Sequence, residues 1–289
     1  MNRKTIFEKI VRGALFASAL LSIAAVLFIS LFLFYRGLPL FKTVRVADFL
    51  FSSTWEPTAE NPSYGILSFI IGSFYVTGLS LLIAVPIGLA AGAYLAELSG
   101  EKNGRIVRSA VELLAGVPSV VYGLFGIALI TRVSRFLFGG SGFNIASASA
   151  VLAIMILPTI INVTEISLRS VNPLLKENSL ALGATRWQTL KSVLMPAANK
   201  GIIAGVVLAM GRAMGETMAV LMVGGNAPIM PTQLNGMVRT LTMNIITDMS
   251  YATGDHLTSL FTTGIVLFIF IVLLNLTVQI ILKKSMEMK

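Results

Sequence analysis

The sequence predicts an all-α membrane protein with six transmembrane helices, and three observations support this prediction. Of the 289 residues 55% are hydrophobic and only 12% are charged, whereas soluble domains have roughly 45–50% apolar residues. Six apolar segments reach the length of about 20 residues that a helix needs to cross a bilayer. Lysine and arginine are concentrated in alternate connecting segments, as expected for cytoplasmic loops.

The predicted helices occupy residues 13–35, 65–95, 109–137, 145–168, 196–223 and 257–282. The first follows a basic segment and is too long for a secretory signal, whose apolar region has roughly 7–15 residues. The second contains Pro86, so we expect it to be tilted or bent. The third contains Pro118 and several glycines, which transmembrane helices tolerate where neighbouring helices satisfy the freed backbone groups.

This arrangement places both termini in the cytoplasm. Fifteen of the 22 Lys and Arg residues then lie inside and six outside, and Arg212 lies within a helix; the positive-inside rule therefore supports the orientation. The chain is expected to comprise an N-terminus and first helix, an external loop, a five-helix core with a cytoplasmic loop at about 170–195, and a short cytoplasmic tail. Their bounds are 1–36, 37–65, 66–282 and 283–289.

Composition argues against several classes of function. The chain has no cysteine and one histidine, which disfavours a disulfide scaffold and a Cys- or His-based metal site. The net charge of +9 is dispersed between apolar runs, so it does not form the clustered basic face of a nucleic-acid partner. The sequence also lacks the G-x-x-x-x-G-K-[ST] loop, so this chain is not expected to bind a nucleotide by that route.

Arg212 and Glu216 stand inside the apolar run of the predicted fifth helix. Each intramembrane charge costs roughly 2.5–3.5 kcal/mol on insertion scales, so such residues indicate a functional site by default. Their spacing of four places them on one helix face. One interpretation is that they only neutralise each other; the other is an anion path, because a guanidinium matches the geometry of oxyanions. Thr217, Ser119 and Tyr122 are further candidates for lining this path.

Glycines recur four residues apart at 88/92, 201/205 and 211/215. This spacing favours close approach of two helix backbones. The last pair brackets Arg212 and precedes Glu216.

The cytoplasmic loop contains a helical pattern with an exposed Trp187, and we expect Pro196 to stop this helix. An exposed aromatic residue on a helix favours docking into the groove of a partner.

The same loop resembles the coupling helix of ABC importer permeases. Glu177, Gly183 and Pro196 match the spacing of that signature, whereas Asn178 and Ser179 replace its two alanines. Further similarity lies in residues 86–97, 117–126 and 211–220, which read PIGLAAGAYLAE, VPSVVYGLFG and GRAMGETMAV. Together these segments resemble the PstC-type permease family of the bacterial phosphate ABC importer.

The resemblance implies a type I-like ABC importer permease fold in the bacterial inner membrane. It implies a transporter subunit rather than an enzyme, which forms half of a path for inorganic phosphate and works by alternating access. The expected partners are a PstA-type second permease, two copies of a cytoplasmic ATPase that bind ATP and Mg, and an external phosphate-binding protein. The residues expected to couple to the ATPase are Glu177, Ala181, Gly183, Ala184, Arg186, Trp187 and Pro196.

Two alternatives remain at the level of sequence. A secondary anion transporter or channel could use the same charged pair without an ATPase, although inverted repeat halves are not visible. An intramembrane enzyme is disfavoured by the lack of an evident catalytic cluster. Three further features are interpreted as interfacial: the i,i+4 pairs Arg108/Glu112 and Glu165/Arg169, and His256.

Overall fold

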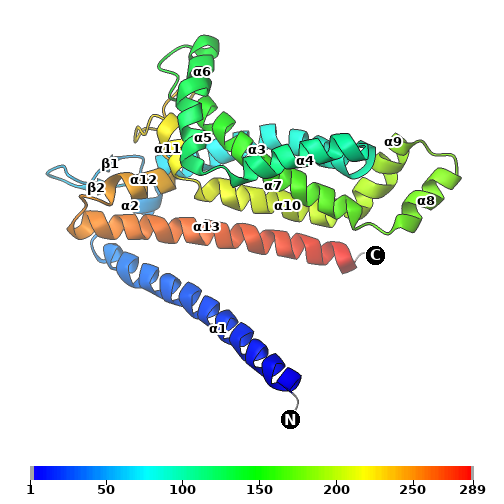
Figure 1. The fold of residues 1–289 in the computed structure, drawn as a ribbon. Helices are drawn as coiled ribbons and strands as arrows, with labels where there is room; N and C mark the ends of the chain where they lie inside the picture. The colour runs from blue at the N-terminus through cyan, green and yellow to red at the C-terminus, as the bar shows by residue number, and fades with distance from the viewer. Residues whose placement is uncertain (1–2, 288–289) are drawn as a thin grey trace.

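The computed structural model describes residues 3–287 and is almost entirely helical (Figure 1). Its α-helices are α1 (Arg3–Gly37), α2 (Val46–Phe51), α3 (Leu67–Ala93), α4 (Glu101–Gly116), α5 (Ser119–Phe125), α6 (Thr131–Phe138), α7 (Ile145–Arg169), α8 (Pro173–Ala181), α9 (Arg186–Thr189), α10 (Met195–Gly215), α11 (Met218–Val223), α12 (Leu241–Asp248) and α13 (Gly254–Glu287). The shorter turns are η1 (Leu38–Lys42), η2 (Tyr94–Leu98), η3 (Gly126–Ile130) and η4 (Leu190–Leu194). Two short strands, β1 (Trp55–Glu56) and β2 (Ser63–Tyr64), pair antiparallel.

Within the described residues, six helical segments are long and apolar enough to cross a membrane, which confirms the predicted number. They are Val11–Lys42, Leu67–Leu98, Ser119–Phe138, Ile145–Arg169, Arg186–Gly215 and Gly254–Thr277.

Helix α7 forms the centre of the bundle and packs against both α3 and α10. Its apolar residues, among them Leu152, Ile156 and Ile160, are almost completely buried. Asn144 caps its first turn by accepting a hydrogen bond from the backbone N–H of Ser147 at 2.9 Å, as expected of an N-cap residue. Because α7 is buried between α3 and α10, it is the helix against which the neighbouring elements pack.

The connecting elements gather at two opposite ends of the bundle (Figure 1). The hairpin end carries η1, α2, the β1–β2 hairpin and α12, whereas the other end carries α8 and α9. The segment expected to be an external loop is packed at the hairpin end, because Leu40, Phe49 and Trp55 share a buried cluster with Phe69 of α3 and Leu260 of α13.

Helix α1 leaves the bundle along most of its length and meets α13 near the hairpin end (Figure 1). The rings of Phe32 and Phe261 contact edge to face with centroids 5.8 Å apart, and Thr262 donates a hydrogen bond to the carbonyl of Gly37. The apolar residues of α1 from Val11 to Ile29 are exposed, which suits a helix surrounded by lipid or by another subunit.

Two predicted helix bounds are wrong. The third predicted helix is two helices, because Pro118 follows an extended Val117 and separates α4 from α5. The fifth starts earlier and ends earlier than expected, since the helical run begins at Arg186 and α10 ends at Gly215. The segment 224–255, expected to be an external connection, also contains the short helix α12.

Candidate functional site

Two helix breaks lie side by side in the bundle, one at the start of the third candidate span and one at the end of the fifth. Helix α4 breaks before α5 at Pro118, and α10 breaks before α11 at Glu216. Helices α5 and α11 pack against each other, so closely that a Cβ on Gly123 would come within 2.5 Å of the sulfur of Met222. Non-helical backbone at membrane depth is tolerated only where it is buried in protein or lines a cavity, so these two breaks form the first part of the candidate site.

Arg212 lies in the last turn of α10 and its side chain is exposed on the surface of this chain. Its Nη1 donates a hydrogen bond of 3.3 Å to the hydroxyl of Thr159 on α7. Among the ion pairs of residues 3–287, Arg212 is not joined to Glu216. The guanidinium is therefore positioned by α7 and is available to a group from outside the chain.

Glu216 does not continue the helix of Arg212, so the predicted shared helix face is wrong. Its backbone is extended (φ −69°, ψ 132°) because α10 ends one residue earlier. Its carboxylate accepts a hydrogen bond of 3.0 Å from the backbone N–H of Ala219 in the first turn of α11. Its carbonyl accepts a second bond, of 2.9 Å, from the hydroxyl of Thr242 on α12. The residue is thus held in the break from two directions.

Two of the neighbouring path candidates, Thr217 and Tyr122, have local hydrogen-bond partners. Thr217 lies in the same break and donates to the carbonyl of Gly215 at 3.4 Å. Ser119 begins α5 and is half-buried. Tyr122 is only 5% exposed, and its hydroxyl donates at 2.6 Å to the carbonyl of Leu114, which also accepts from the N–H of Val117 at the end of α4. A role for these residues in lining a path stays a prediction.

The glycine pairs divide into two kinds. Gly88, Gly92, Gly201 and Gly205 all face α7, where an added Cβ would lie within 2.8 Å of Ile160, Thr164, Ser167 or Val163. These pairs confirm the predicted close packing. Around Gly211 and Gly215, by contrast, an added Cβ would meet no atom within 4 Å among the described residues. No helix of this chain packs against the pair, so the side of α10 that bears it is left uncovered within the described residues.

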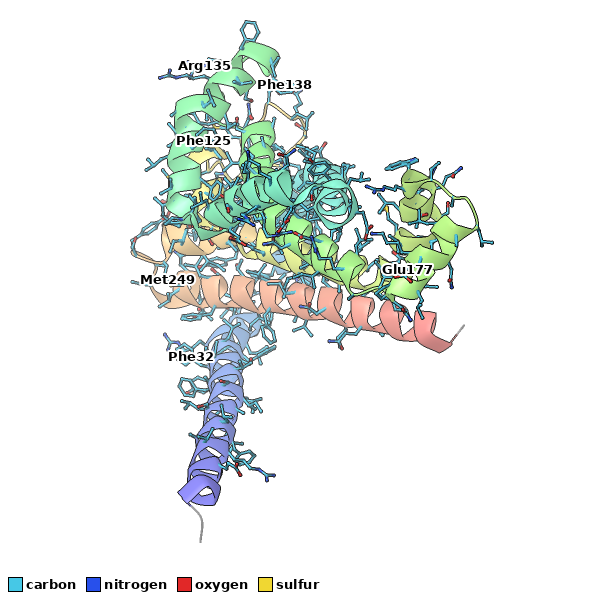
Figure 2. All side chains as sticks on the ribbon, turned by 45° about the vertical axis from the view of Figure 1, so that its right-hand side comes forward. Phe32, Phe125, Arg135, Phe138, Glu177 and Met249 are labelled. Atoms are coloured by element: carbon cyan, nitrogen blue, oxygen red, sulfur yellow. The ribbon has the colours of Figure 1, made fainter. Side chains whose placement is uncertain are left out.

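Helices α8 and α9 project at the far end of the molecule, where Glu177 is labelled in Figure 2. Gly183 joins them with φ +86°, a conformation that favours glycine. Its N–H bonds the carbonyl of Leu180 at 3.0 Å and so closes the C-terminus of α8. Thr185 caps α9 through a reciprocal pair of hydrogen bonds with Gln188.

The predicted coupling residues cluster on this projection. Trp187 is 61% exposed and Leu182 is 89% exposed, so the expected exposure of Trp187 is confirmed. The remaining predicted coupling residues here are exposed except for the half-buried Ala184; they are Glu177, Ala181, Gly183, Ala184 and Arg186.

The expectation that Pro196 stops the helix is wrong. Helix α9, the π-helical turn η4 and α10 run on without a gap from Arg186 to Gly215. Pro196 stands in the first turn of α10, directly after the π-helical turn in which Met195 donates to Leu190. Proline has no N–H to donate, and the π-helical turn shifts the backbone hydrogen bonds directly before it, so the helix continues through Pro196. One helical run thus joins the projection to Arg212.

Glu165, near the α8/α9 end, has one partner that its i,i+4 spacing predicted and one that it did not. Glu165 on α7 is 6% exposed and pairs with two arginines. Arg169 donates to it at 2.9 Å, as the i,i+4 spacing predicts. Arg108 on α4 also binds Glu165, rather than the predicted Glu112. At the same end, Lys176 of α8 pairs with Glu97 of η2 at 2.5 Å.

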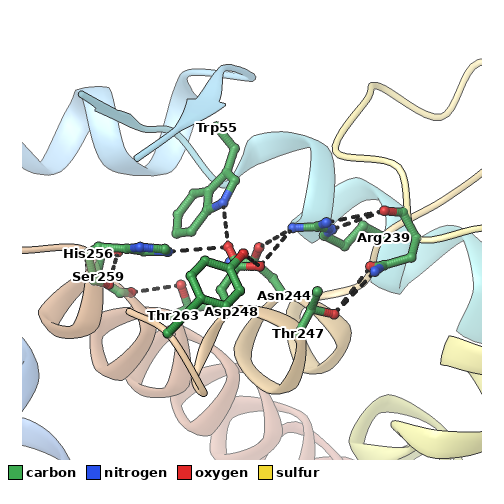
Figure 3. A network of polar contacts seen from close by, with 10 residues as sticks. Trp55, Arg239, Asn244, Thr247, Asp248, His256, Ser259 and Thr263 are labelled. Atoms are coloured by element: carbon green, nitrogen blue, oxygen red, sulfur yellow. Dashed lines mark hydrogen bonds and ion pairs between the residues drawn. The ribbon is translucent and has the colours of Figure 1, made fainter. Parts of the chain in front are cut away.

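Asp248 is the centre of a polar network at the hairpin end, shown in Figure 3. Its carboxylate receives hydrogen bonds from Trp55 at 3.0 Å and Tyr251 at 2.8 Å, and contacts Arg239 at 3.4 Å and His256 at 3.3 Å. Burial lowers the pKa of Arg239, an effect that the Asp248 carboxylate opposes. Burial, followed by the hydrogen bond to Asp248, raises the pKa of Tyr251. His256, interpreted as interfacial, is buried within this chain.

With this geometry in view, comparison with known proteins identifies the class. Residues 84–286 match the family described as binding-protein-dependent transport system inner membrane component. The chain belongs to this family. Its members are permease subunits whose ATPase is a separate subunit, and the family description itself implies a substrate-binding protein as a partner.

Individual relatives agree with the family assignment. The chain is 41% identical to the probable ABC transporter permease protein YqgH of Bacillus subtilis, an alignment that covers 92% of this chain and 89% of that protein. It is 36% identical to the phosphate transport system permease protein PstC of Mesorhizobium japonicum, over 77% of this chain and 74% of that protein.

Solved structures show the same fold. A bacterial ABC transporter involved in the import of the acidic polysaccharide alginate matches with a TM-score of 0.65 at 16% identity, over 97% of this chain and 99% of that chain. An inward-facing MetNI methionine ABC transporter matches with a TM-score of 0.59 at 20% identity, over 74% of this chain and 92% of that chain. The chain is therefore a multi-pass inner-membrane permease subunit, which disfavours the secondary transporter and enzyme alternatives.

Proposed function

We propose that this chain is one of the two permease subunits of an ATP-driven importer for inorganic phosphate. The observation that carries the proposal is the pair of charges at the α10–α11 break, with Arg212 exposed and not paired to Glu216 within the described residues. A guanidinium presents a planar fork that matches two oxygens of phosphate. The similarity to PstC-type phosphate permeases supports this substrate.

Glu216 has a separate task in this proposal. A carboxylate accepts a hydrogen bond only from an oxyanion that still carries a proton; near neutral pH phosphate does, whereas sulfate does not. One carboxylate oxygen of Glu216 already accepts from Ala219, so the other is the acceptor for the substrate. Glu216 therefore favours phosphate and repels sulfate.

The proposed complex pairs this chain with a second, PstA-type permease that closes the uncovered side of Gly211 and Gly215. Two ATPase copies bind ATP and Mg and contact the α8–α9 projection, and a phosphate-binding protein delivers the substrate at the hairpin end. Both termini lie in the cytoplasm. Movement of the ATPases reaches Arg212 through the helical run that begins at Arg186, and this movement alternates access to the path.

Phosphate uptake by the reconstituted complex tests the role of Arg212. We expect Arg212→Gln to lower uptake about 10–100-fold, because it removes hydrogen bonds to a charged group that are worth about 1.5–3 kcal/mol. Arg212→Lys keeps the charge without the fork, so we expect an intermediate rate. Arg105→Gln is the matched control, since Arg105 is exposed on α4 and lies outside the site. Normal uptake by Arg212→Gln would contradict the proposal.

The ratio of phosphate to sulfate transport tests Glu216. In Glu216→Gln the amide oxygen can still accept from Ala219, so the local fold is retained while the negative charge is lost. We expect sulfate uptake to rise relative to phosphate uptake. If the variant excludes sulfate as well as the parent does, Glu216 does not discriminate between the two anions.

A further inference from the structure

A second group of anion-binding side chains lies between α4 and α7, away from the α10–α11 break. A cavity of about 260 Å³ is lined by side chains of both helices at this point. Its lining residues are Arg108, Glu112, Asn162, Glu165, Ile166 and Arg169. The two arginine side chains are 38% and 52% exposed, so the cavity is accessible from outside the chain.

The arginines in this cavity have donors beyond those that hold the helices together. Each guanidinium carries five N–H donors. In the part of the chain that the structure describes, Arg108 donates one hydrogen bond, to Glu165. Arg169 donates two, to Glu165 at 2.9 Å and to the carbonyl of Leu95 at 3.1 Å. Glu165 therefore orients both forks and leaves further N–H groups for an oxyanion.

One face of α7 connects this cavity with Arg212. Thr159 accepts the hydrogen bond from Arg212, and Asn162, Ile166 and Arg169 follow it at intervals of three, four and three residues, which keeps them on the same helix face. The ten residues from Thr159 to Arg169 correspond to about 15 Å along the axis. Thr159 and Asn162 are half-buried, whereas Ile166 and Arg169 are exposed.

We propose that the α4–α7 cavity is a second binding station for protonated phosphate, which the anion occupies after it leaves Arg212. This inference rests on the proposed function. Arg108 and Arg169 bind the phosphate oxygens, Asn162 contributes an amide donor, and the exposed Glu112 accepts a hydrogen bond from the P–O–H group of the phosphate. The two carboxylates of the lining offset the two guanidiniums, so the station binds weakly. Weak binding suits a position on the way out, where retention would slow release.

The absence of cysteine from this chain permits a direct test in the assembled complex with cysteine-free partner subunits. Asn162→Cys and Ile166→Cys each place one thiol in the cavity, and Asn103→Cys places a control thiol on the exposed start of α4. The rate of modification by an anionic methanethiosulfonate reagent is measured with phosphate or with sulfate at equal ionic strength. Phosphate-stimulated ATP hydrolysis is measured on the same samples.

We expect phosphate to slow modification of the two cavity thiols about threefold at twice its dissociation constant, with no effect at position 103 and none from sulfate. Adding Arg108→Gln to Ile166→Cys should remove the protection, and Arg108→Lys should restore part of it. Equal modification rates in phosphate and in sulfate, with phosphate-stimulated ATP hydrolysis intact, would overturn the station. The Arg108, Glu165 and Arg169 contacts would then serve only to hold α4 against α7. If phosphate does not stimulate ATP hydrolysis by the complex without cysteine substitutions, phosphate import itself would be overturned.

Discussion

Asp248 shows how one side chain can hold several elements together. Its carboxylate joins Trp55 of β1, Arg239, Tyr251 and His256 of α13, and it is only 2% exposed. A buried charge is tolerated when it is paired and hydrogen-bonded. The network therefore fixes the hairpin onto α12 and α13, and it depends on a single negative charge.

Replacing that charge should destabilise the fold. Asp248→Asn keeps the size of the side chain but leaves Arg239 buried without a counter-charge, and breaking a buried pair in this way costs about 3–5 kcal/mol. We expect a clear fall in the thermal unfolding midpoint, followed in detergent by tryptophan fluorescence. Asp255→Asn is the control, because Asp255 is exposed at the same end. Equal midpoints for the two variants would refute this account.

Gly183 is a residue whose effect should remain local. It has φ +86° and an added Cβ would meet no described atom within 4 Å, so Gly183→Ala tests backbone strain alone, at about 1–2 kcal/mol. We expect less ATPase subunit to copurify, because the angle between α8 and α9 changes. Gly100→Ala is the control, since Gly100 has open space but φ −67°. Unchanged copurification would argue that the turn does not set the docking geometry.

At the scale of elements, helix packing was easier to predict than helix interruption. The spacing of Gly88 and Gly92 was sufficient to indicate close packing, because four residues make one turn of a helix. The break at Glu216 has no proline beside it and depends on Thr242, a residue 26 positions later. Similarly, i,i+4 spacing identified Arg169 as a partner of Glu165 but could not identify Arg108, which is 57 residues away.

The contact between α3 and α7 provides a matched pair of substitutions. A Cβ on Gly92 would lie 2.7 Å from Cβ of Thr164 and 2.8 Å from the carbonyl oxygen of Ile161. Gly92→Ala should therefore force α3 away from α7 and cost about 1–3 kcal/mol. Gly78→Ala, in open space on the same helix, should be neutral or slightly stabilising. Thermal unfolding in detergent compares the two, and similar midpoints would contradict the packing described for Gly92.

For the whole molecule, the sequence predicted six spans and one exposed projection, but not the uncovered side of α10. The uncovered side of Gly211 and Gly215 could not be predicted, because it depends on where all the other helices of this chain lie. The α8–α9 projection was predictable because Trp187 is an aromatic residue in a polar, basic segment. The α10–α11 break was not, because the hydropathy of the run continues through it.

The orientation of the whole chain can be measured with introduced thiols. Positions 60 and 103 lie at opposite ends of the bundle and are exposed. We expect an impermeant thiol reagent to modify Glu60→Cys in intact cells, and to modify Asn103→Cys only after the membrane is made permeable. This result follows from the excess of basic residues at the α8/α9 end. The reverse pattern would require the opposite topology.

The hydrogen bond from Thr242 to Glu216 makes α12 a short lever. Asp248, at one end of the helix, is anchored to the hairpin, and Thr242 lies six residues away, or about 9 Å along the axis. A rotation of about 10° around Asp248 would displace Thr242 by about 1.5 Å, enough to break a hydrogen bond that is now 2.9 Å long. A displacement of the hairpin would thus reach the backbone of Glu216 through this one short helix.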